Sequence, residues 1–488
     1  MSIIGRKHEQ QYLQKLLYSK KAEFIASYGR RRIGKTFLIR TFFKTHPDVI
    51  FFNNTGLKDG STEEQISNFI KVISKVFYNE ALLLIPDNWG DAFEALNQAI
   101  KHAPTHKKIV LFFDELPWMA TPKSKLLQQL DYFWNHYWSN NPVIKLIICG
   151  SSASWIIDNI INNRGGLHNR ITGKIHLQAF TLEESAEFLH HLGVRLTHKH
   201  ILKIYMTLGG VPYYLEQVKP GNSAIEVISQ LFFGSHSLLR DEYDNLFASL
   251  FNNAEKYTTI IETLAKRPYG VGKNELLEIL GVSEAGGGGI KKLTELENTG
   301  FIMSFKPFGH KRQGIYYRLM DEYCSFYLKW VLPYKNSMSK NMDFQEISRE
   351  PGWNTWLGYS FEVLCYKHLP QIKNILKINA IATPNAWRYA PKKLEASTGA
   401  QIDLLFDRSD DAITICEIKY SEEPYLVSKN DIESLQRKID VFKKQTGTTK
   451  QIFIALITTQ GIQNNYYADT IIEKIVSVET LLDIKPSS

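Results

Sequence analysis

A glycine-rich segment near the amino terminus constrains the fold of this 488-residue sequence more than any other feature. Gly29-Arg30-Arg31-Arg32-Ile33-Gly34-Lys35-Thr36 fits the pattern G-x-x-x-x-G-K-[ST] at every fixed position. The apolar run Glu23–Tyr28 precedes it and three apolar residues follow it, which predicts a strand before the loop and a helix after it. Backbone N–H groups and the positive end of the helix dipole then meet where phosphate oxygens bind. The segment therefore predicts a phosphate-binding loop rather than an ordinary surface turn.

A second apolar run ends in two carboxylates and completes the predicted site. Residues 109–113 are all apolar and are followed by Asp114 and Glu115. In an open parallel sheet, ligands bind at the edge where the carboxyl ends of the strands meet. Lys35 is expected to reach the β- and γ-phosphates of ATP, and Thr36 and Asp114 to hold Mg²⁺. Glu115 is expected to polarise the water that attacks the γ-phosphate.

Strand-like and helical patterns alternate up to about Val218, which predicts an α/β fold with a parallel sheet. Each strand candidate is rich in Ile, Val or Phe at consecutive positions, as expected where helices cover both faces of a sheet. The candidates are Glu23–Tyr28, Val49–Asn53, Ile109–Asp114 and Lys145–Ser151.

Composition excludes several classes of protein. A chain with 44% hydrophobic and 22% charged residues is typical of a globular protein, and its length suggests about three domains. No apolar run is long enough to span a bilayer, so no membrane partner is expected. The four cysteines lack paired spacing, which argues against disulfides and favours the cytoplasm. Lys plus Arg exceeds Asp plus Glu by 58 − 50 = 8, which is compatible with DNA as a partner.

These residues resemble AAA+-like P-loop ATPases, and in particular a prokaryotic family of archaeal-type ATPases that joins this module to a winged helix and a nuclease-like domain. The resemblance implies an ATPase core over 1–180, a helical lid over 181–250, a winged helix over 251–335 and a nuclease-like domain over 350–488. It also implies that Gly5 and Arg6 lie beside the adenine and that Ser151 senses the γ-phosphate. Arg164 and Arg170 fall where similar proteins place a phosphate-facing or inter-subunit arginine, and either can equally be a surface charge.

Self-association through the ATPase module is a further implication of this resemblance. The segment Leu208–Leu215 is similar to the lid-helix signature of the family. The same pattern also predicts, without reference to any family, a helix end followed by a helix that starts at proline. No conspicuous sensor arginine follows it, which leaves ring formation open.

The middle region reads as a winged helix. Helices are expected at Tyr257–Arg267, Lys273–Leu280 and Gly289–Asn298, and a wing hairpin at Phe301–Phe305 and Ile315–Leu319. Ile290, Leu293 and Leu296 are expected on one buried face of the third helix, with Lys291 and Lys292 on the other. Basic residues of the hairpin loop (Lys306, His310, Lys311 and Arg312) favour DNA binding, although the same fold also serves as a packing module between domains.

The carboxy-terminal region carries acidic and basic residues on two predicted strands, Gln401–Phe406 and Ile413–Tyr420. Because side chains alternate along a strand, Glu417 and Lys419 are expected on one face, within reach of Asp403. Buried carboxylates and an ammonium are costly unless they bind something, and carboxylate oxygens suit Mg²⁺.

This pattern resembles the PD-(D/E)xK nuclease superfamily in its Holliday-junction-resolvase-like form, a restriction-endonuclease-like fold. The resemblance implies that Glu362, in Gly358–Glu362, joins Asp403 and Glu417 as a metal ligand and that Lys419 is catalytic. Ile402 stands where the superfamily name has proline. Gln436, on the predicted helix Asp431–Phe442, is a weaker match to a polar residue of the family. Members of the superfamily also occur as binding modules, so cleavage stays open.

The modules together suggest an ATP-hydrolysing protein whose nucleotide state controls a DNA-binding or DNA-cleaving domain. One alternative is a signalling switch of the STAND type, in which ATP drives association with a protein and the carboxy-terminal domain only binds. Another is a defence or toxin nuclease that the ATPase restrains.

Overall fold

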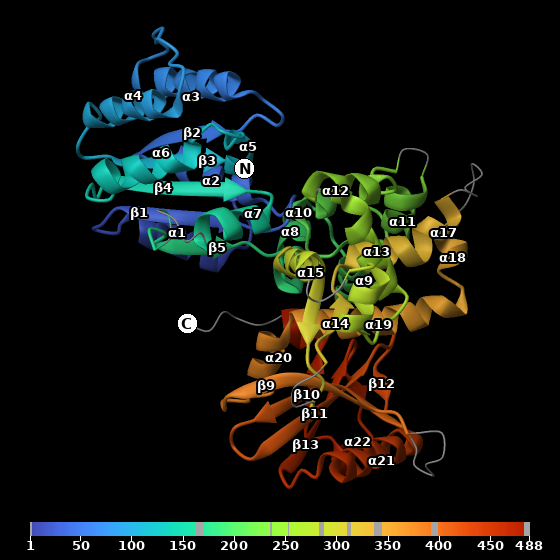
Figure 1. The fold of residues 1–488 in the computed structure, drawn as a ribbon. Coiled ribbons are helices and arrows are strands. Elements are labelled where there is room, and N and C mark those ends of the chain that lie inside the picture. The colour runs from blue at the N-terminus through green and yellow to red at the C-terminus, as the bar shows by residue number, and fades with distance from the viewer. Residues whose placement is uncertain are drawn as a thin grey trace. The chain divides into compact units, whose positions relative to one another are not determined.

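The computed structural model describes residues 2–162, 167, 169–234, 237–251, 253–282, 287–309, 314–335, 344–391 and 399–482. The chain divides into two compact units (Figure 1). The first runs from the amino terminus to Ala179 and includes Asn298–Gly300. The second holds Phe180–Glu297 and the chain from Phe301 onward.

The first unit is a five-stranded parallel sheet with the order β2-β3-β4-β1-β5. Its strands are β1 (Glu23–Tyr28), β2 (Val49–Thr55), β3 (Lys108–Asp114), β4 (Ile144–Gly150) and β5 (Gly173–His176). The predicted parallel sheet and its first four strands are confirmed within two residues at each end. The short β5 was not predicted, because only one of its four residues is buried and no apolar run marks it.

Helices cover both faces of this sheet, and the alternation of strand side chains decides which residues meet which helices (Figure 1). Ile25 and Val110 belong to the core on one side, and Phe24 and Leu111 to the core on the other. The first side is covered by α1 (Lys7–Leu17) and α2 (Lys35–Lys44). The second is covered by α3 (Thr62–Phe77), α4 (Trp89–Lys101) and α6 (Leu126–Phe133).

The second unit begins with helices in the region predicted as a lid. They are α8 (Leu182–His191), α9 (His198–Leu208), α10 (Pro212–Leu215), α11 (Ala224–Ile228) and α12 (Glu242–Leu250). Serine and threonine N-caps start two of them, because Thr181 and Ser223 each form a capping box with the glutamate three residues later. No helix among the described residues combines the length and apolar composition needed to cross a membrane.

Three helices and a small sheet follow. The helices are α13 (Ala254–Ala265), α14 (Lys273–Ile279) and α15 (Gly288–Asn298), and the antiparallel sheet has the order β6-β8-β7, with β6 (Val271–Gly272), β7 (Ile302–Phe305) and β8 (Tyr316–Leu319). On α15, Leu293 and Leu296 are buried as expected, but Ile290 is 39% exposed. Gly289 takes the inner position instead, because it lies four residues before Leu293 and faces Leu277.

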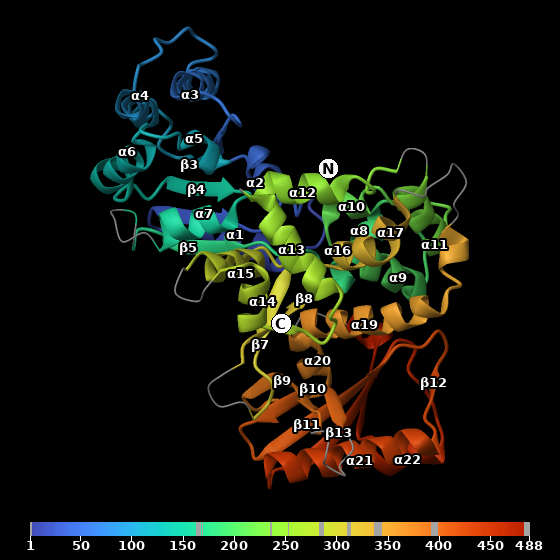
Figure 2. The ribbon, with the colours of Figure 1, turned by 45° about the vertical axis from the view of Figure 1, so that its right-hand side comes forward.

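The hairpin predicted as a DNA-contacting wing packs against the carboxy-terminal region. The backbone N–H of Phe308 donates to the carbonyl of Ala386 (2.9 Å), and the Phe308 ring lies 5.3 Å from that of Phe442. The chain that follows β7 runs toward β9 (Figure 2). Lys306 is exposed, whereas His310, Lys311 and Arg312 lie outside the described residues. The apolar part of the hairpin loop is therefore a domain-packing element.

The carboxy-terminal sheet has the order β15-β13-β11-β10-β9 and is of mixed direction. Its strands are β9 (Ala382–Tyr389), β10 (Ala400–Arg408), β11 (Ala412–Lys419), β13 (Gln451–Thr458) and β15 (Lys474–Ser477). The first three form an antiparallel meander, and β13 and β15 run parallel to β11. Apolar residues of α19 (Pro351–Lys367) pack on one face, and those of α21 (Lys429–Thr446) pack on the other.

One hydrophobic core runs through the second unit from Phe180 to Leu481. A buried histidine lies within it: His368 Nε2 accepts from the backbone N–H of Leu182 at the start of α8 (3.0 Å), and Nδ1 donates to the carbonyl of Leu364 (2.8 Å). Burial lowers the pKa of His368 to about 4, because a charged imidazole loses its hydration. The lid region and the carboxy-terminal region are therefore joined through a neutral imidazole.

We predict that this imidazole makes the second unit sensitive to acid. The folded pKa of about 4 lies below the unfolded value of about 6.5, so the stabilisation is present above pH 6.5 and is lost as the pH falls toward 4, by about 3 kcal/mol in all. Urea unfolding at pH 7 and pH 5 should show about 2 kcal/mol of this loss in the wild type and not in His368→Gln. The exposed His198→Gln is the matched control, and an unchanged pH dependence in His368→Gln would contradict the assignment.

Candidate functional site

Backbone conformation shapes the predicted phosphate-binding loop. Gly29 has a φ of 141°, and a Cβ atom there would lie 2.3 Å from the carbonyl oxygen of Leu177. Gly34 has a φ of 88° and forms the N-cap of α2. Both positions require glycine, the first for space and conformation and the second for conformation alone. The loop thus leads from β1 into the amino terminus of a ten-residue helix, as the sequence predicts.

Lys35 is buried in this loop with 6% of its surface exposed. Its Nζ donates to the carbonyls of Gly29 (2.8 Å) and Arg30 (2.7 Å). Burial lowers its pKa, because the ammonium is removed from water. An anionic ligand on the loop would offset that cost.

Thr36 and Asp114 meet across the edge of the sheet. The Thr36 hydroxyl donates to Asp114, 3.0 Å from each carboxylate oxygen. Burial raises the pKa of Asp114, and the hydrogen bond from Thr36 and the charge of Arg40, 3.9 Å away, act in the opposite direction. A hydroxyl and a carboxylate at this spacing are oxygen donors of the kind that Mg²⁺ prefers. Arg40 was not singled out in the sequence, since it is an ordinary helical arginine there.

Glu115 is held by Ser151 at the end of the neighbouring strand. The backbone N–H and the hydroxyl of Ser151 donate to Glu115 Oε2 at 2.9 and 3.0 Å. Glu115 has a left-handed backbone (φ 49°), which turns its side chain away from the strand direction. Burial raises its pKa, and the donors on Ser151 lower it. Ser151 therefore contacts the predicted base directly.

The remaining predicted residues of the first unit divide into those near the loop and those away from it. Gly5 and Arg6 are buried, and Arg6 Nη2 donates to the carbonyl of Ile33 (3.1 Å), which joins the amino-terminal segment to the loop. Within the loop, Arg30 and Ile33 are buried and Arg31 and Arg32 are partly exposed. Arg170 is exposed in the turn before β5. Arg164 lies outside the described residues.

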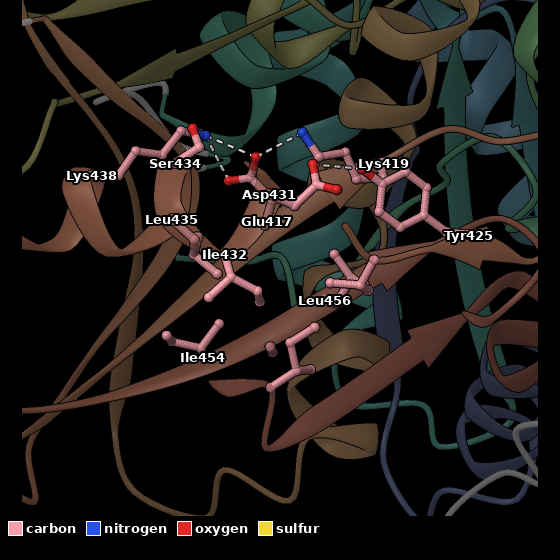
Figure 3. Close-up of a pocket in the computed structure, with 13 residues that line it drawn as sticks. Glu417, Lys419, Tyr425, Asp431, Ile432, Ser434, Leu435, Lys438, Ile454 and Leu456 are labelled. Carbon is pink, nitrogen blue, oxygen red and sulfur yellow. Dashed lines mark hydrogen bonds and ion pairs between the residues drawn. The ribbon is translucent and has the colours of Figure 1, made fainter. Parts of the chain in front are cut away.

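A second cluster of charged residues lies on the carboxy-terminal sheet, around Glu417 of β11. Lys419 Nζ lies 2.9 Å from Glu417 Oε1, so the two side chains share a face as predicted. Lys438 of α21 donates to both carboxylate oxygens of Glu417 at 2.8 Å. Figure 3 shows the two ammonium groups on either side of the carboxylate, above the apolar side chains of Leu435 and Ile454. Burial opposes the charge on Lys419, yet its partner Glu417 raises the lysine pKa overall.

Asp403 and Glu362 belong to the same cluster, because the charges of its carboxylates act on one another's pKa. Leu404 pairs with Cys416, which brings Asp403 to the level of Glu417 on the adjacent strand. Burial and the charge of Glu417 raise the pKa of Asp403. Burial and the charge of Asp403 raise the pKa of Glu362 to about 8. Among the described residues, no three His, Cys, Asp or Glu side chains stand at metal-binding spacing.

Lys438 was missed in the sequence, where Gln436 was the residue noted on this helix. Gln436 is exposed and donates to Asp440 (3.1 Å), so it lies away from the cluster. A signal for Lys438 was nevertheless present: it lies three residues after Leu435 and four before Phe442, both of which are buried. A charged residue within the apolar stripe of a helix points to a buried partner.

The comparisons with known proteins bear on the first unit most directly. Residues 4–218 match the family model of an ATPase domain predominantly from Archaea. The uncharacterized protein MJECL04 of Methanocaldococcus jannaschii is 24% identical over 449 residues, which cover 90% of this chain and 91% of that protein. Together with the phosphate-binding loop and the sheet edge described above, this match identifies residues 4–218 as an ATPase domain.

Two solved structures show weaker likeness. The Walker-type ATPase PABY2304 of Pyrococcus abyssi aligns with 67% of this chain and 96% of its own length, at 19% identity and a TM-score of 0.47. The ORC2 protein of Aeropyrum pernix, in ADPNP–ADP complexes, aligns with 72% of this chain and 96% of its own, at 14% identity and a TM-score of 0.42.

We predict that Lys35→Ala and Glu115→Gln separate two steps of the ATPase reaction. Lys35→Ala should abolish nucleotide binding in calorimetry and lower hydrolysis by about a hundredfold, because the buried cation is lost. Glu115→Gln should bind ATP and lower hydrolysis by a similar factor, since the carboxylate that polarises water is lost. Phosphate release measures both. Lys44→Ala, at the far end of α2, is the control, and full hydrolysis by Glu115→Gln would exclude the role given to that residue.

Proposed function

We propose that the first unit binds ATP with Mg²⁺ at the edge formed by the loop and the ends of β3 and β4. Lys35 binds the β- and γ-phosphates, and Thr36 and Asp114 hold the magnesium ion. Glu115 orients the attacking water, with Ser151 fixing the position of its carboxylate. The hydrogen bonds Thr36–Asp114 and Ser151–Glu115 support these roles, because they set the side chains at the mouth of the loop.

We propose further that the carboxy-terminal region is a restriction-endonuclease-like domain that acts on DNA. The observation that carries this proposal is that Asp403, Glu417 and Lys419 lie together on one antiparallel strand pair. Glu362 is close enough for the charges of Asp403 and Glu417 to raise its pKa. The element order supports it: a helix, a three-stranded meander, a second helix and a parallel strand. The three helices and small sheet of the middle region fit a winged helix that serves here to pack against this domain.

The residues of this cluster fit a magnesium ion by their donor chemistry. Asp403, Glu417 and the carbonyl of Ile418 offer oxygen donors, and Glu362 adds a further carboxylate. A bound Mg²⁺ would supply Lewis-acid stabilisation of phosphate charge. Lys419 would orient the water or stabilise the charge that develops on the phosphate, because its ammonium is held beside Glu417 (2.9 Å).

The order of the modules suggests how the two activities are joined. ATP binding at Lys35 and Thr36 would change the arrangement of the lid region, and the lid would control access of DNA to the carboxy-terminal site. A continuous core joins the lid region to that domain, which makes such a coupling physically reasonable. If the Lys35→Ala protein cleaved DNA as well as the wild type, this coupling would be wrong.

The nuclease proposal is tested by incubating the purified protein with labelled single-stranded, duplex and branched DNA, Mg²⁺ and ATP. We expect cleavage by the wild type and a loss of about a hundredfold in Lys419→Ala and in Asp403→Asn, because each removes a group at the reacting phosphate. Lys429→Ala, an exposed lysine at the start of α21, is the matched control. Nucleotide and DNA products are read together, and the absence of cleavage on every DNA form would refute the proposal.

Lys438 favours a second candidate, in which the carboxy-terminal domain binds without cleaving. Its ammonium satisfies both oxygens of Glu417, which are the oxygens that a metal ion would need. The protein would then be an ATP-dependent switch for a protein or nucleic-acid partner. A salt-sensitive complex with DNA in a gel-shift assay, without products, would favour this reading over the nuclease.

We predict that Lys438→Met strengthens metal binding at this cluster. Removal of a cation beside Glu417 should tighten Mg²⁺ binding by about tenfold, because the ion no longer competes with a fixed positive charge. Calorimetric titration of the nucleotide-free protein measures this, with Glu417→Ala subtracted to isolate the cluster. Cleavage that appears only in Lys438→Met would identify this lysine as the block, and equal magnesium affinity in both proteins would show that it does not compete.

A further inference from the structure

Arg318 of β8 reaches the acidic cluster from the middle region. Its side chain is 6% exposed and its guanidinium lies between two aromatic rings, 4.3 Å from the centroid of Phe305 and 4.1 Å from that of Tyr366. Its Nε has no hydrogen-bond acceptor in the described structure. The charge of Arg318 acts on Glu362, whose pKa it lowers against the larger effect of burial. A buried arginine that stacks on rings and keeps a free donor is suited to an incoming anion.

A pocket of about 350 Å³ opens beside this arginine. Its walls come from both regions of the second unit: β7, β8 and the turn before β6 on one side, and β9 and β10 on the other. Glu362 and Asp403 are among its lining residues, so the pocket adjoins the proposed metal site. Aromatic and basic side chains are prominent in its lining, which includes four aromatic residues and two arginines: Tyr269, Phe305, Tyr316, Trp387, Arg318 and Arg388.

Tyr269 presents an accessible ring in a fixed position. Its hydroxyl is 2.9 Å from that of Tyr359 on α19, and the guanidinium of Arg388 lies 5.3 Å from its ring centroid. The side chain is nevertheless 42% exposed, so part of the ring remains open to a ligand. An anchored aromatic ring bordered by an arginine is a surface on which a planar base can stack.

We propose that this pocket binds one nucleotide unit of a single DNA strand, with the base stacked on Tyr269 and a phosphate on Arg318. The inference rests on the proposed function and names its substrate: a strand end or an unpaired nucleotide. The cavity of about 350 Å³ offers room for a base beside Tyr269. A phosphate on Arg318 would place the next phosphodiester toward Asp403 and Glu417. The middle region thereby contributes part of the carboxy-terminal site.

The test measures binding apart from cleavage. A 5′-labelled twelve-nucleotide single strand and its duplex are titrated by fluorescence anisotropy with Ca²⁺ in place of Mg²⁺, and a denaturing gel checks that the strand stays intact. The full chain is used as wild type, Tyr269→Ala, Tyr269→Phe, Arg318→Lys and Arg318→Met. Tyr466→Ala, an equally aromatic and 79% exposed position outside the pocket, is the matched control. A titration with thymidine monophosphate tests the isolated nucleotide.

Tyr269→Ala and Arg318→Met should each weaken single-strand binding by about tenfold, and Tyr269→Phe and Tyr466→Ala by less than about twofold. Arg318→Lys should fall between, because it keeps the charge and loses the planar stacking. Duplex binding should change less than single-strand binding. Binding of the monophosphate by the wild type and not by Tyr269→Ala also supports the pocket.

Equal single-strand affinity of the wild type, Tyr269→Ala and a folded Arg318→Lys would overturn this inference. Failure of this inference and failure of the nuclease proposal give different results. Single-strand binding that depends on Tyr269, without cleavage of any DNA, would support the nucleotide pocket and refute the nuclease proposal. DNA cleavage that is equally fast in variants of Tyr269 and Arg318 would support the nuclease proposal and refute the nucleotide pocket.

Discussion

The cost of removing ionised groups from water is the constraint on which both sites of this protein depend. Lys35 lies buried among backbone carbonyls, and Glu417 lies buried between two ammonium groups. A charge in such a place is tolerated only when fixed partners replace its hydration. Each site is therefore assembled where a strand ends and a helix passes, because those positions bring donors and acceptors from different parts of the chain.

Local patterns made the first site readable from sequence, and distant contacts limited what could be read of the second. The backbone geometry of the loop Gly29–Thr36 follows from its own two glycines. The strand that ends in Asp114 can be predicted from its own apolar run, without information on the neighbouring strands. The pair Glu417 and Lys419 was equally local, because it follows from strand alternation.

The contacts of Lys438 and Arg318 could not be predicted in the same way. The apolar stripe of its helix indicates that Lys438 is near the core, but neither sequence names the partner, which each residue acquires only when its element packs against another. The hairpin loop is a similar case. Its basic residues favoured a prediction of DNA binding, whereas the structure shows that its apolar residue Phe308 packs on the carboxy-terminal domain. Gly289 takes the buried position predicted for Ile290 for a similar reason, because Leu277 of α14 leaves no room there for a side chain.

The single core of the second unit has a consequence for how this protein can be divided. His368 and the apolar residues around it serve the lid region and the carboxy-terminal sheet at once. A fragment cut before α19 would carry away part of a shared interior and expose apolar surface that its sheet alone cannot cover. The three regions are consequently separate in sequence but inseparable in folding, and exchange of one for a homologous module would require a matching interior on both sides of the junction.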